Sequence, residues 1–380
     1  MRRRGAGHGI GGNREVLQRE RMIRGLTDCV HRLSMRIIVA CGMFLLAGVL
    51  LAYFFQRLPI EGTSLGIDWR GLWLGIEGGR LCYGTGMRNP PWSILPLLPL
   101  GLLSFKESWA VLTLSTLAIE VLSVPQNGSK HRNWPLTIFL VTSYPSLRTL
   151  ADGNLELLPI AGVLLICVAW RRMNTGIMAA GLLMASAKPQ ETWLLIAVLG
   201  WLLLRTWPPR SVLKLSAALV AVVVPSLLLY AEPWFSALLA IEARGSILDV
   251  SLSATLMRLG LPSWVRSVLW VVLLAGTLRI AFARGFRLSR EAAGLLISSS
   301  LLLAPYAAGN NLLTVIAIGL PPLFRAHVAS ALGLAVLADL PYLALAHRDL
   351  MVSYGASYTT AVLLAAWGIF AWRVQRRAPE

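Results

Sequence analysis

Apolar segments separated by short basic loops run through most of the 380-residue chain. Hydrophobic residues make up 56% of it and charged residues only 14%, against about 25% charged in a typical soluble domain. A helix needs roughly 17–25 apolar residues to cross a bilayer. The pattern predicts an all-α polytopic transmembrane protein of about 12 spans: 37–55, 108–125, 135–150, 155–170, 175–188, 190–204, 212–231, 263–283, 291–307, 310–324, 327–346 and 356–372.

The basic residues orient these spans. The net charge of +17 is spread over many loops and forms no single basic face, which argues against a nucleic-acid partner. Of the 35 Lys and Arg residues, 24 fall on the cytoplasmic side if the apolar stretch Pro91–Phe105 does not cross the membrane. Cytoplasmic loops carry such an excess. We therefore interpret Pro91–Phe105 as an interfacial or re-entrant helix of the first extracytoplasmic loop, with four prolines in or just before it that start, kink and stop it.

This topology predicts a cytoplasmic Arg-rich tail over residues 1–36, one membrane domain over 37–374 and a cytoplasmic tail over 375–380. Both termini then lie in the cytoplasm. Arg outnumbers Lys 31 to 4, which is typical of a GC-rich bacterial genome and indicates the bacterial plasma membrane as the location.

Two short motifs in the chain carry no chemistry. Gly7–Gly12 matches G-x-G-x-x-G, but no strand precedes it, so it is expected to be tail. The glycosylation sequon Asn127-Gly128-Ser129 falls on the cytoplasmic side. The five His and four Cys residues are scattered and predict no metal cluster or redox pair, although a divalent metal beside Asp68 stays open.

Charged residues gather at the extracytoplasmic ends of the early helices. Charges near bilayer depth are costly and mark functional sites by default. This cluster consists of Asp68, Arg70, Glu77, Arg80, Arg88, Arg148, Asp152, Glu156, Lys188 and Glu191.

The motifs around these charges resemble the GT-C glycosyltransferases, and among them the bacterial polyprenyl-phosphate-mannose-dependent branch, glycosyltransferase family 87. Asp68 follows the first span, and a Gly-Gly pair and the Pro90-Pro91 helix come after it. The order continues with Asp152-Gly153-Asn154-Leu155-Glu156, Lys188-Pro189-Gln190 and Ala304-Pro305-Tyr306. Asn154 and Glu156 stand where the family has Gln and Asn, and Asn310 or Asn311 where it has a late Asp.

The resemblance implies a membrane-embedded hexosyltransferase that moves a sugar, expected to be mannose, from a polyprenyl-phosphate donor to a lipid or glycan acceptor outside the membrane. Asp68 would be the general base. Lys188 would bind the donor phosphate, with Arg70, Arg80, Arg88 and Arg148 as further candidates. Substrate-binding candidates are Asp152, Asn154, Glu156, Gln190 and Asn310.

Four of these residues also have a structural interpretation. Asp68 caps a helix or pairs with Arg70, Lys188 snorkels from a helix end, and Arg148 and Asp152 form a local salt bridge, the favoured interpretation for that pair. At the level of the whole chain, a transporter or lipid flippase, or a protein that only binds lipid-linked sugar, are the alternatives. The charges lie near one face and the two halves show no repeat, which favours the enzyme over the transporter.

Overall fold

The computed structural model describes residues 42–58, 63–83, 87–125, 133–239, 248–344 and 348–377. The predicted Arg-rich tail, the sequon and the start of the first predicted span lie outside these ranges. Contacts divide the chain into two units, residues 1–57 and 58–380. In the first, the described residues form one apolar helix, Gly42–Gln56.

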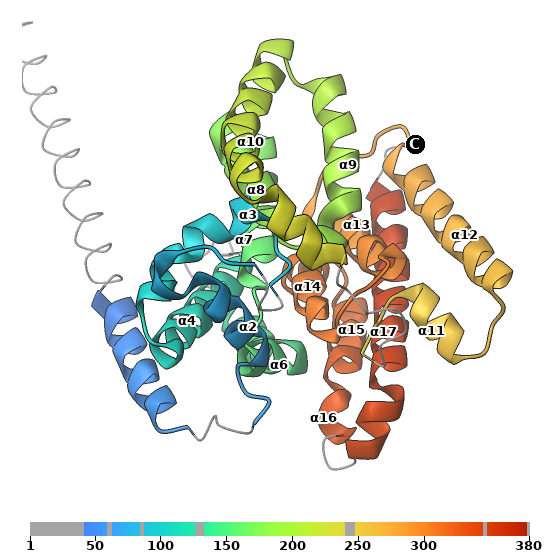
Figure 1. Ribbon diagram of the computed structural model, residues 1–380. Coiled ribbons are helices and arrows are strands. Elements are labelled where there is room, and N and C mark those ends of the chain that lie inside the picture. Colours follow the sequence, from blue (N-terminus) through green and yellow to red (C-terminus); the bar gives the residue numbers. More distant parts are fainter. Residues whose placement is uncertain are drawn as a thin grey trace, which may run out of the picture. The chain divides into compact units, whose positions relative to one another are not determined.

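The described part of the second unit is built from helices and contains no strand, which confirms the all-α class. Its α-helices and 3₁₀-helices (η) are α2 (Ile67–Ile76), η1 (Glu77–Gly79), α3 (Pro91–Ile94), η2 (Leu95–Leu102), α4 (Phe105–Ser123), α5 (Trp134–Thr142), α6 (Tyr144–Asp152), α7 (Leu157–Arg172), α8 (Thr175–Ala185), α9 (Pro189–Thr206), α10 (Pro209–Leu239), α11 (Leu252–Arg258), α12 (Ser263–Ala281), α13 (Arg290–Leu303), η3 (Gly309–Asn311), α14 (Leu312–Ala326), α15 (Val328–Asp339), α16 (Pro341–Ala344) and α17 (Arg348–Arg377) (Figure 1).

Three described helices are long and apolar enough to cross a membrane: Pro209–Leu239, Ser263–Ala281 and Tyr354–Arg376. The prediction of twelve spans is therefore not confirmed. Several other apolar segments form shorter helices, such as α7 with 16 residues and α8 with 11. At 1.5 Å per residue, these two are shorter than the roughly 30 Å hydrocarbon layer.

The predicted span 135–150 is wrong as a single helix, because the chain breaks at Ser143 into α5 and α6. Ser143 has an extended backbone, and its hydroxyl caps the backbone N–H of Ser146 at 3.4 Å. Pro145 cannot donate to the carbonyl of Val141. The Ser146 hydroxyl donates to that carbonyl instead, at 3.2 Å, and also contacts both carboxylate oxygens of buried Glu120. Proline and the serine hydroxyls explain the break.

The stretch Pro91–Phe105 forms the short kinked helix that its prolines predict. One α-helical turn, α3, runs into the 3₁₀-helix η2, which contains Pro99 and ends at Leu102. Together they extend roughly 22 Å, which is too short to span. The side chain of Asn89 donates to the carbonyl of Ala187 at 2.9 Å, and Trp92 donates to the Ser186 hydroxyl at 2.9 Å. These bonds fasten the start of the segment to the end of α8.

Helix α13 is the centre of the hydrophobic core. Every residue from Glu291 to Leu303 is buried, and α9, α14 and α17 pack around it (Figure 1). Gly294 and Gly319 face the Phe370 ring of α17, where a Cβ would lie 3.0 and 2.1 Å from ring atoms. The small residues therefore let one aromatic ring enter between α13 and α14.

The Arg290 guanidinium at the start of α13 joins three helices. It donates to the carbonyls of Ala317 at 2.6 Å and Ile318 at 3.0 Å in α14, and of Ser123 at 2.5 Å at the end of α4. Residues 321 and 322 of α14 are both proline, so the carbonyls four residues earlier, at 317 and 318, have no helical N–H partner. Arg290 supplies the missing donors.

We expect Arg290→Met to destabilise the protein by about 3 kcal/mol or more, because three buried carbonyls lose a charged donor. Thermal unfolding in detergent measures this as a lower Tm. The matched control is Arg279→Met, at an exposed position in the last turn of α12. The triple variant with Pro321→Ala and Pro322→Ala should recover part of the loss, since it restores two helical N–H groups. An unchanged Tm in Arg290→Met would contradict this role.

Candidate active site

The α7–α8 hairpin brings two distant motifs together. The two helices pack closely against each other through the small residues Gly162, Gly181 and Ala185. A Cβ on Gly162 would lie 2.3 Å from the backbone N of Ala185, and one on Gly181 would lie 2.9 Å from the Gly162 carbonyl oxygen. The close antiparallel contact places the residues after α8, including Lys188, beside Asn154 and Glu156, which precede α7.

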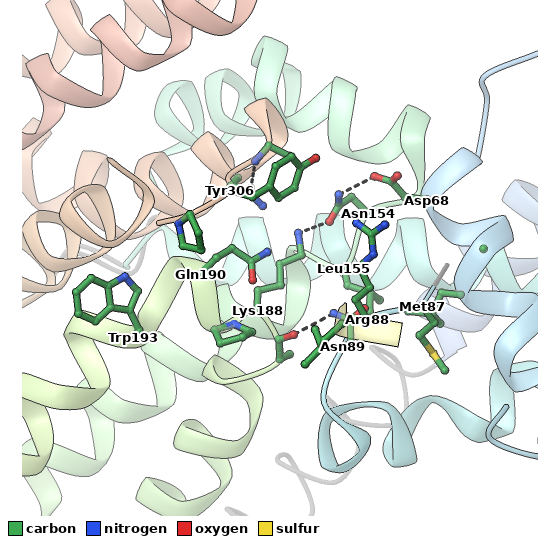
Figure 2. Close-up of a pocket in the computed structure, with 18 of the residues that line it drawn as sticks. Asp68, Met87, Arg88, Asn89, Asn154, Leu155, Lys188, Gln190, Trp193 and Tyr306 are labelled. Carbon is green, nitrogen blue, oxygen red and sulfur yellow. Dashed lines mark hydrogen bonds between the residues drawn. The ribbon is translucent and has the colours of Figure 1, made fainter. Parts of the chain in front are cut away.

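A cavity of about 830 Å³ opens beside this junction (Figure 2). Its polar wall comes from the start of α2, the segment before α3 and the junctions that flank α7 and α8. Its apolar wall comes from α9, α10, α12 and α13. The lining includes Asp68, Arg88, Asn89, Asn154, Lys188, Gln190, Trp193, Leu238, Trp270, Leu303, Tyr306 and Asn311.

Asp68 lies in the first turn of α2 with its carboxylate exposed to the cavity. Its Oδ2 accepts from Asn154 Nδ2 at 2.7 Å and from Asn310 Nδ2 at 3.3 Å. Both bonds end on Oδ2, so within the described residues Oδ1 is left for another donor. Gly66 is the N-cap of α2, and the Arg70 guanidinium lies 5.4 Å from the Phe105 ring centroid. The capping interpretation of Asp68 is therefore wrong.

Lys188 lies on the cavity wall but is only 6% exposed. Its ammonium group donates to Glu156 and to the side-chain oxygen of Asn154, and lies 3.4 Å from Glu191 Oε1. Both glutamates are fully buried. Asn311 bonds Glu156 at 2.8 Å and Glu191 at 2.6 Å, which completes a buried polar network. Lys188 does not snorkel to water, so that interpretation is wrong.

The predicted arginines divide into two groups. Arg88 is exposed and lines the cavity, and it forms no salt bridge within the described part of the chain. Trp234 of α10 donates to the Arg88 carbonyl at 3.0 Å and so holds its backbone. Arg70, Arg80 and Arg148 do not line the cavity. The structure thus brings Arg88, but not the other three, to the site.

Arg148 and Asp152 form the local salt bridge that was favoured for them. Arg148 Nε donates to Asp152 Oδ2 at 2.6 Å along α6. Burial raises the pKa of the Asp152 carboxyl above its ordinary value; Arg148 opposes the rise and the nearby Asp68 adds to it. Arg148 is therefore engaged by Asp152, and the pair flanks Asp68 outside the cavity wall.

The other substrate-binding candidates occupy different depths. Gln190 is half-buried and lines the cavity, whereas Glu156 lies behind it, bonded to Lys188 and to Thr314 at 2.5 Å. Asn310 reaches Asp68 through its nitrogen, and its buried Oδ1 has no bond partner among the described residues. A contact of Gln190 or Asn310 with substrate stays a prediction.

Sequence reasoning did not select Asp249 for the site. This buried carboxylate accepts from the backbone N–H of Ser251 at 2.9 Å and of Ala307 at 3.0 Å, and so holds the loop that carries Tyr306 to the cavity. A polar residue between Leu248 and Val250 was the one available signal. Thr314 was not selected either, and Asn311 was named only as the alternative to Asn310 for the family's late Asp.

The described residues contain no group of three or more His, Cys, Asp and Glu side chains that could hold a metal ion. Asp68 is the one carboxylate among the described residues that line the cavity. A divalent metal at Asp68 would therefore need further oxygen ligands from a bound phosphate.

Comparison with known families decides the class of this site. A model of glycosyltransferase family 87 matches residues 88–307, more than half of the chain. The chain belongs to glycosyltransferase family 87. The resemblance drawn from the motifs is thereby confirmed, and the protein is a membrane glycosyltransferase. The matched range contains Arg88, Asn154 and Lys188, while Asp68 and Asn310 lie outside it. Searches of curated proteins and of solved structures found no match.

We expect Arg88→Gln to lower kcat/KM for a lipid-phosphate donor about 10–100-fold, because it removes one charge-assisted bond. Arg80→Gln is the matched control, since Arg80 is exposed but does not line the cavity. Steady-state transfer by the two variants measures the difference. Equal losses in both would contradict the assignment of Arg88 to the cavity.

We expect Gly162→Ala to lower both Tm and transfer, because its Cβ would push α8 from α7 and separate Lys188 from Glu156. Overpacking of this kind typically costs about 1–3 kcal/mol. Gly176→Ala is the control, since a Cβ there would make only an ordinary contact, 3.5 Å from Asn174 Oδ1. Wild-type stability and transfer in Gly162→Ala would contradict the view that the close α7–α8 contact at Gly162 positions Lys188.

Proposed function

We propose that this protein is a hexosyltransferase that transfers a sugar, with mannose the expected one, from a polyprenyl-phosphate donor to a lipid or glycan acceptor. The reaction would take place on the extracytoplasmic face of a bacterial plasma membrane, with both termini of the chain in the cytoplasm. One observation carries the proposal: an exposed carboxylate, Asp68, and a cation free of described salt bridges, Arg88, line one cavity.

The geometry supports a single displacement. Asp68 would take the proton of the acceptor hydroxyl through Oδ1 while the hydroxyl oxygen attacks the anomeric carbon. The bond between that carbon and the phosphate oxygen then breaks, and the electron pair leaves with the polyprenyl phosphate. Asp68 is the one carboxylate among the described residues of the cavity lining. A double displacement would need a nucleophile besides the base, usually a second carboxylate, so this arrangement favours inversion at the anomeric carbon.

The cations would act on the leaving group. Negative charge grows on the phosphate as the glycosidic bond breaks, and a fixed positive group stabilises it. Arg88 is the primary candidate because its guanidinium is exposed in the cavity. Lys188 is the weaker candidate, because its donors are already directed at Glu156, Glu191 and Asn154.

The apolar wall fits the lipid part of such a donor. Trp193 and Trp270 line it with Leu238 and Leu303, and both indole N–H groups are occupied. Trp193 donates to the Ser300 carbonyl at 3.2 Å and Trp270 to the Leu303 carbonyl at 2.9 Å. With their polar atoms satisfied, the rings present apolar surface to the cavity. Isoprenoid units, or the flat face of a sugar ring, suit that surface.

The decisive experiment follows transfer of radiolabelled sugar from polyprenyl-phosphate-mannose in membranes that contain the protein. We expect Asp68→Asn to lower kcat about 10²–10⁴-fold with little change in donor binding, because general base catalysis contributes that much.

Glu77→Gln is the matched control, since Glu77 is an exposed acid of the same region that does not line the cavity. Full activity in Asp68→Asn would remove Asp68 from the base role. A wild-type protein that binds the donor but transfers from none of several donor sugars would instead support the alternative of a lipid-linked-sugar binder.

A further inference from the structure

Three polar side chains form a continuous chain of hydrogen bonds into the site. The buried ammonium of Lys188 donates to the Asn154 side-chain oxygen, and the Asn154 nitrogen donates to Asp68 Oδ2 at 2.7 Å (Figure 2). The three residues come from the start of α2, the loop before α7 and the start of α9. Among the described residues, Asn154 is the one side chain that bonds both Lys188 of the buried network and Asp68.

The direction of the Asn154 amide is fixed by chemistry. A lysine ammonium only donates hydrogen bonds, and an ionised carboxylate only accepts them. An amide between the two must therefore turn its oxygen to Lys188 and its nitrogen to Asp68. The opposite orientation would set donor against donor on one side and acceptor against acceptor on the other.

Lys188 is itself held in place, so it can serve as the fixed end of the chain. Glu156 and Glu191 are both 0% exposed and both lie within ion-pair distance of its ammonium. Asn311, 1% exposed, bridges the two carboxylates. Moving the ammonium would leave two buried carboxylates without their cation, which is strongly unfavourable.

We propose that Asn154 is a positioning residue, which Lys188 orients so that its amide holds the Asp68 carboxylate in place. The inference rests on the proposed base role of Asp68 and assigns Asn154 a part in preparing the base, in place of direct contact with substrate. Asn310 makes the second, longer bond to the same oxygen.

Other ionisable groups also face Asp68. Asp152 lies on the neighbouring helix α6, paired with Arg148, and Tyr306 and Lys188 interact with Asp68 across the cavity. Of these groups, Lys188 is bonded to Asn154, whereas Asp152 and Tyr306 are not. Changes at Asn154 therefore report on its bonds to Asp68 and to Lys188, and Asn154→Asp keeps an oxygen acceptor for Lys188.

The substitution Asn154→Asp separates the bond of residue 154 to Lys188 from its bond to Asp68. The carboxylate that it introduces would keep the bond to Lys188, so the fold is expected to survive. The same carboxylate would also place an oxygen against Asp68 Oδ2, and like charges at that separation raise the pKa of one of them. Asn154→Ala would remove the bond without adding charge, and Asn154→Gln would restore an amide.

Two readouts test these variants in the full-length protein. The first is the acidic limb of the pH profile of kcat/KM with polyprenyl-phosphate-mannose. The second is an infrared pH titration of the carboxyl C=O stretch, assigned to residue 68 by comparison with Asp68→Asn, which needs no activity. We expect both to move to higher pH by about one unit in Asn154→Asp, by less in Asn154→Ala, and back towards wild type in Asn154→Gln.

The control is Asn174→Asp at the exposed N-cap of α8, where the same change should leave both readouts unmoved. If transfer depends on Asp68 but neither readout moves in Asn154→Asp, the positioning role is overturned and the proposed function stands. If the infrared titration moves while the wild type transfers nothing, the positioning role holds and the proposed function fails.

Discussion

The site depends on one buried cation. Glu156 and Glu191 lie in the core with no exposed surface, and a buried carboxylate is tolerated only when it is paired or hydrogen-bonded. Lys188 supplies the charge, and Asn311 and Thr314 supply neutral donors. These ion pairs and hydrogen bonds hold four segments together: the loop before α7, the start of α9, η3 and the first turn of α14. The cavity wall is the outer surface of this network.

Much of the site was predictable from local sequence. Asp68, Asn154, Lys188 and Gln190 stand in motifs with a recognisable order, and the topology placed them on one side of the membrane before any contact was known. The structure confirms that these side chains meet around one cavity. Local sequence did not show which of several similar residues would line the cavity. Arg70, Arg80 and Arg88 look alike in the sequence, and only the tertiary fold turns Arg88 into the cavity.

The errors have identifiable physical causes. Hydropathy sums over a window, so it merged α5 and α6 across Ser143, where a proline and two serine hydroxyls redirect the backbone. It also cannot tell a lipid-facing helix from a buried one. Helix α13 is apolar and lies inside the protein. Helix α10 is also apolar, but almost none of it is buried in the protein, as suits a helix that faces lipid. Asp249 was missed because its partners are backbone N–H groups, which leave no trace in side-chain patterns.

The contact of Arg290 with α14 bears on how the chain is made. Synthesis reaches Arg290 more than twenty residues before Ala317 and Ile318, whose carbonyls it will satisfy. At that moment the Ser123 carbonyl at the end of α4 is the one partner of the three already synthesised. A buried guanidinium with two of its three acceptors missing is costly, so α13 gains most when α14 packs against it early. Biogenesis would then be sensitive to the length and composition of the short segment that joins them.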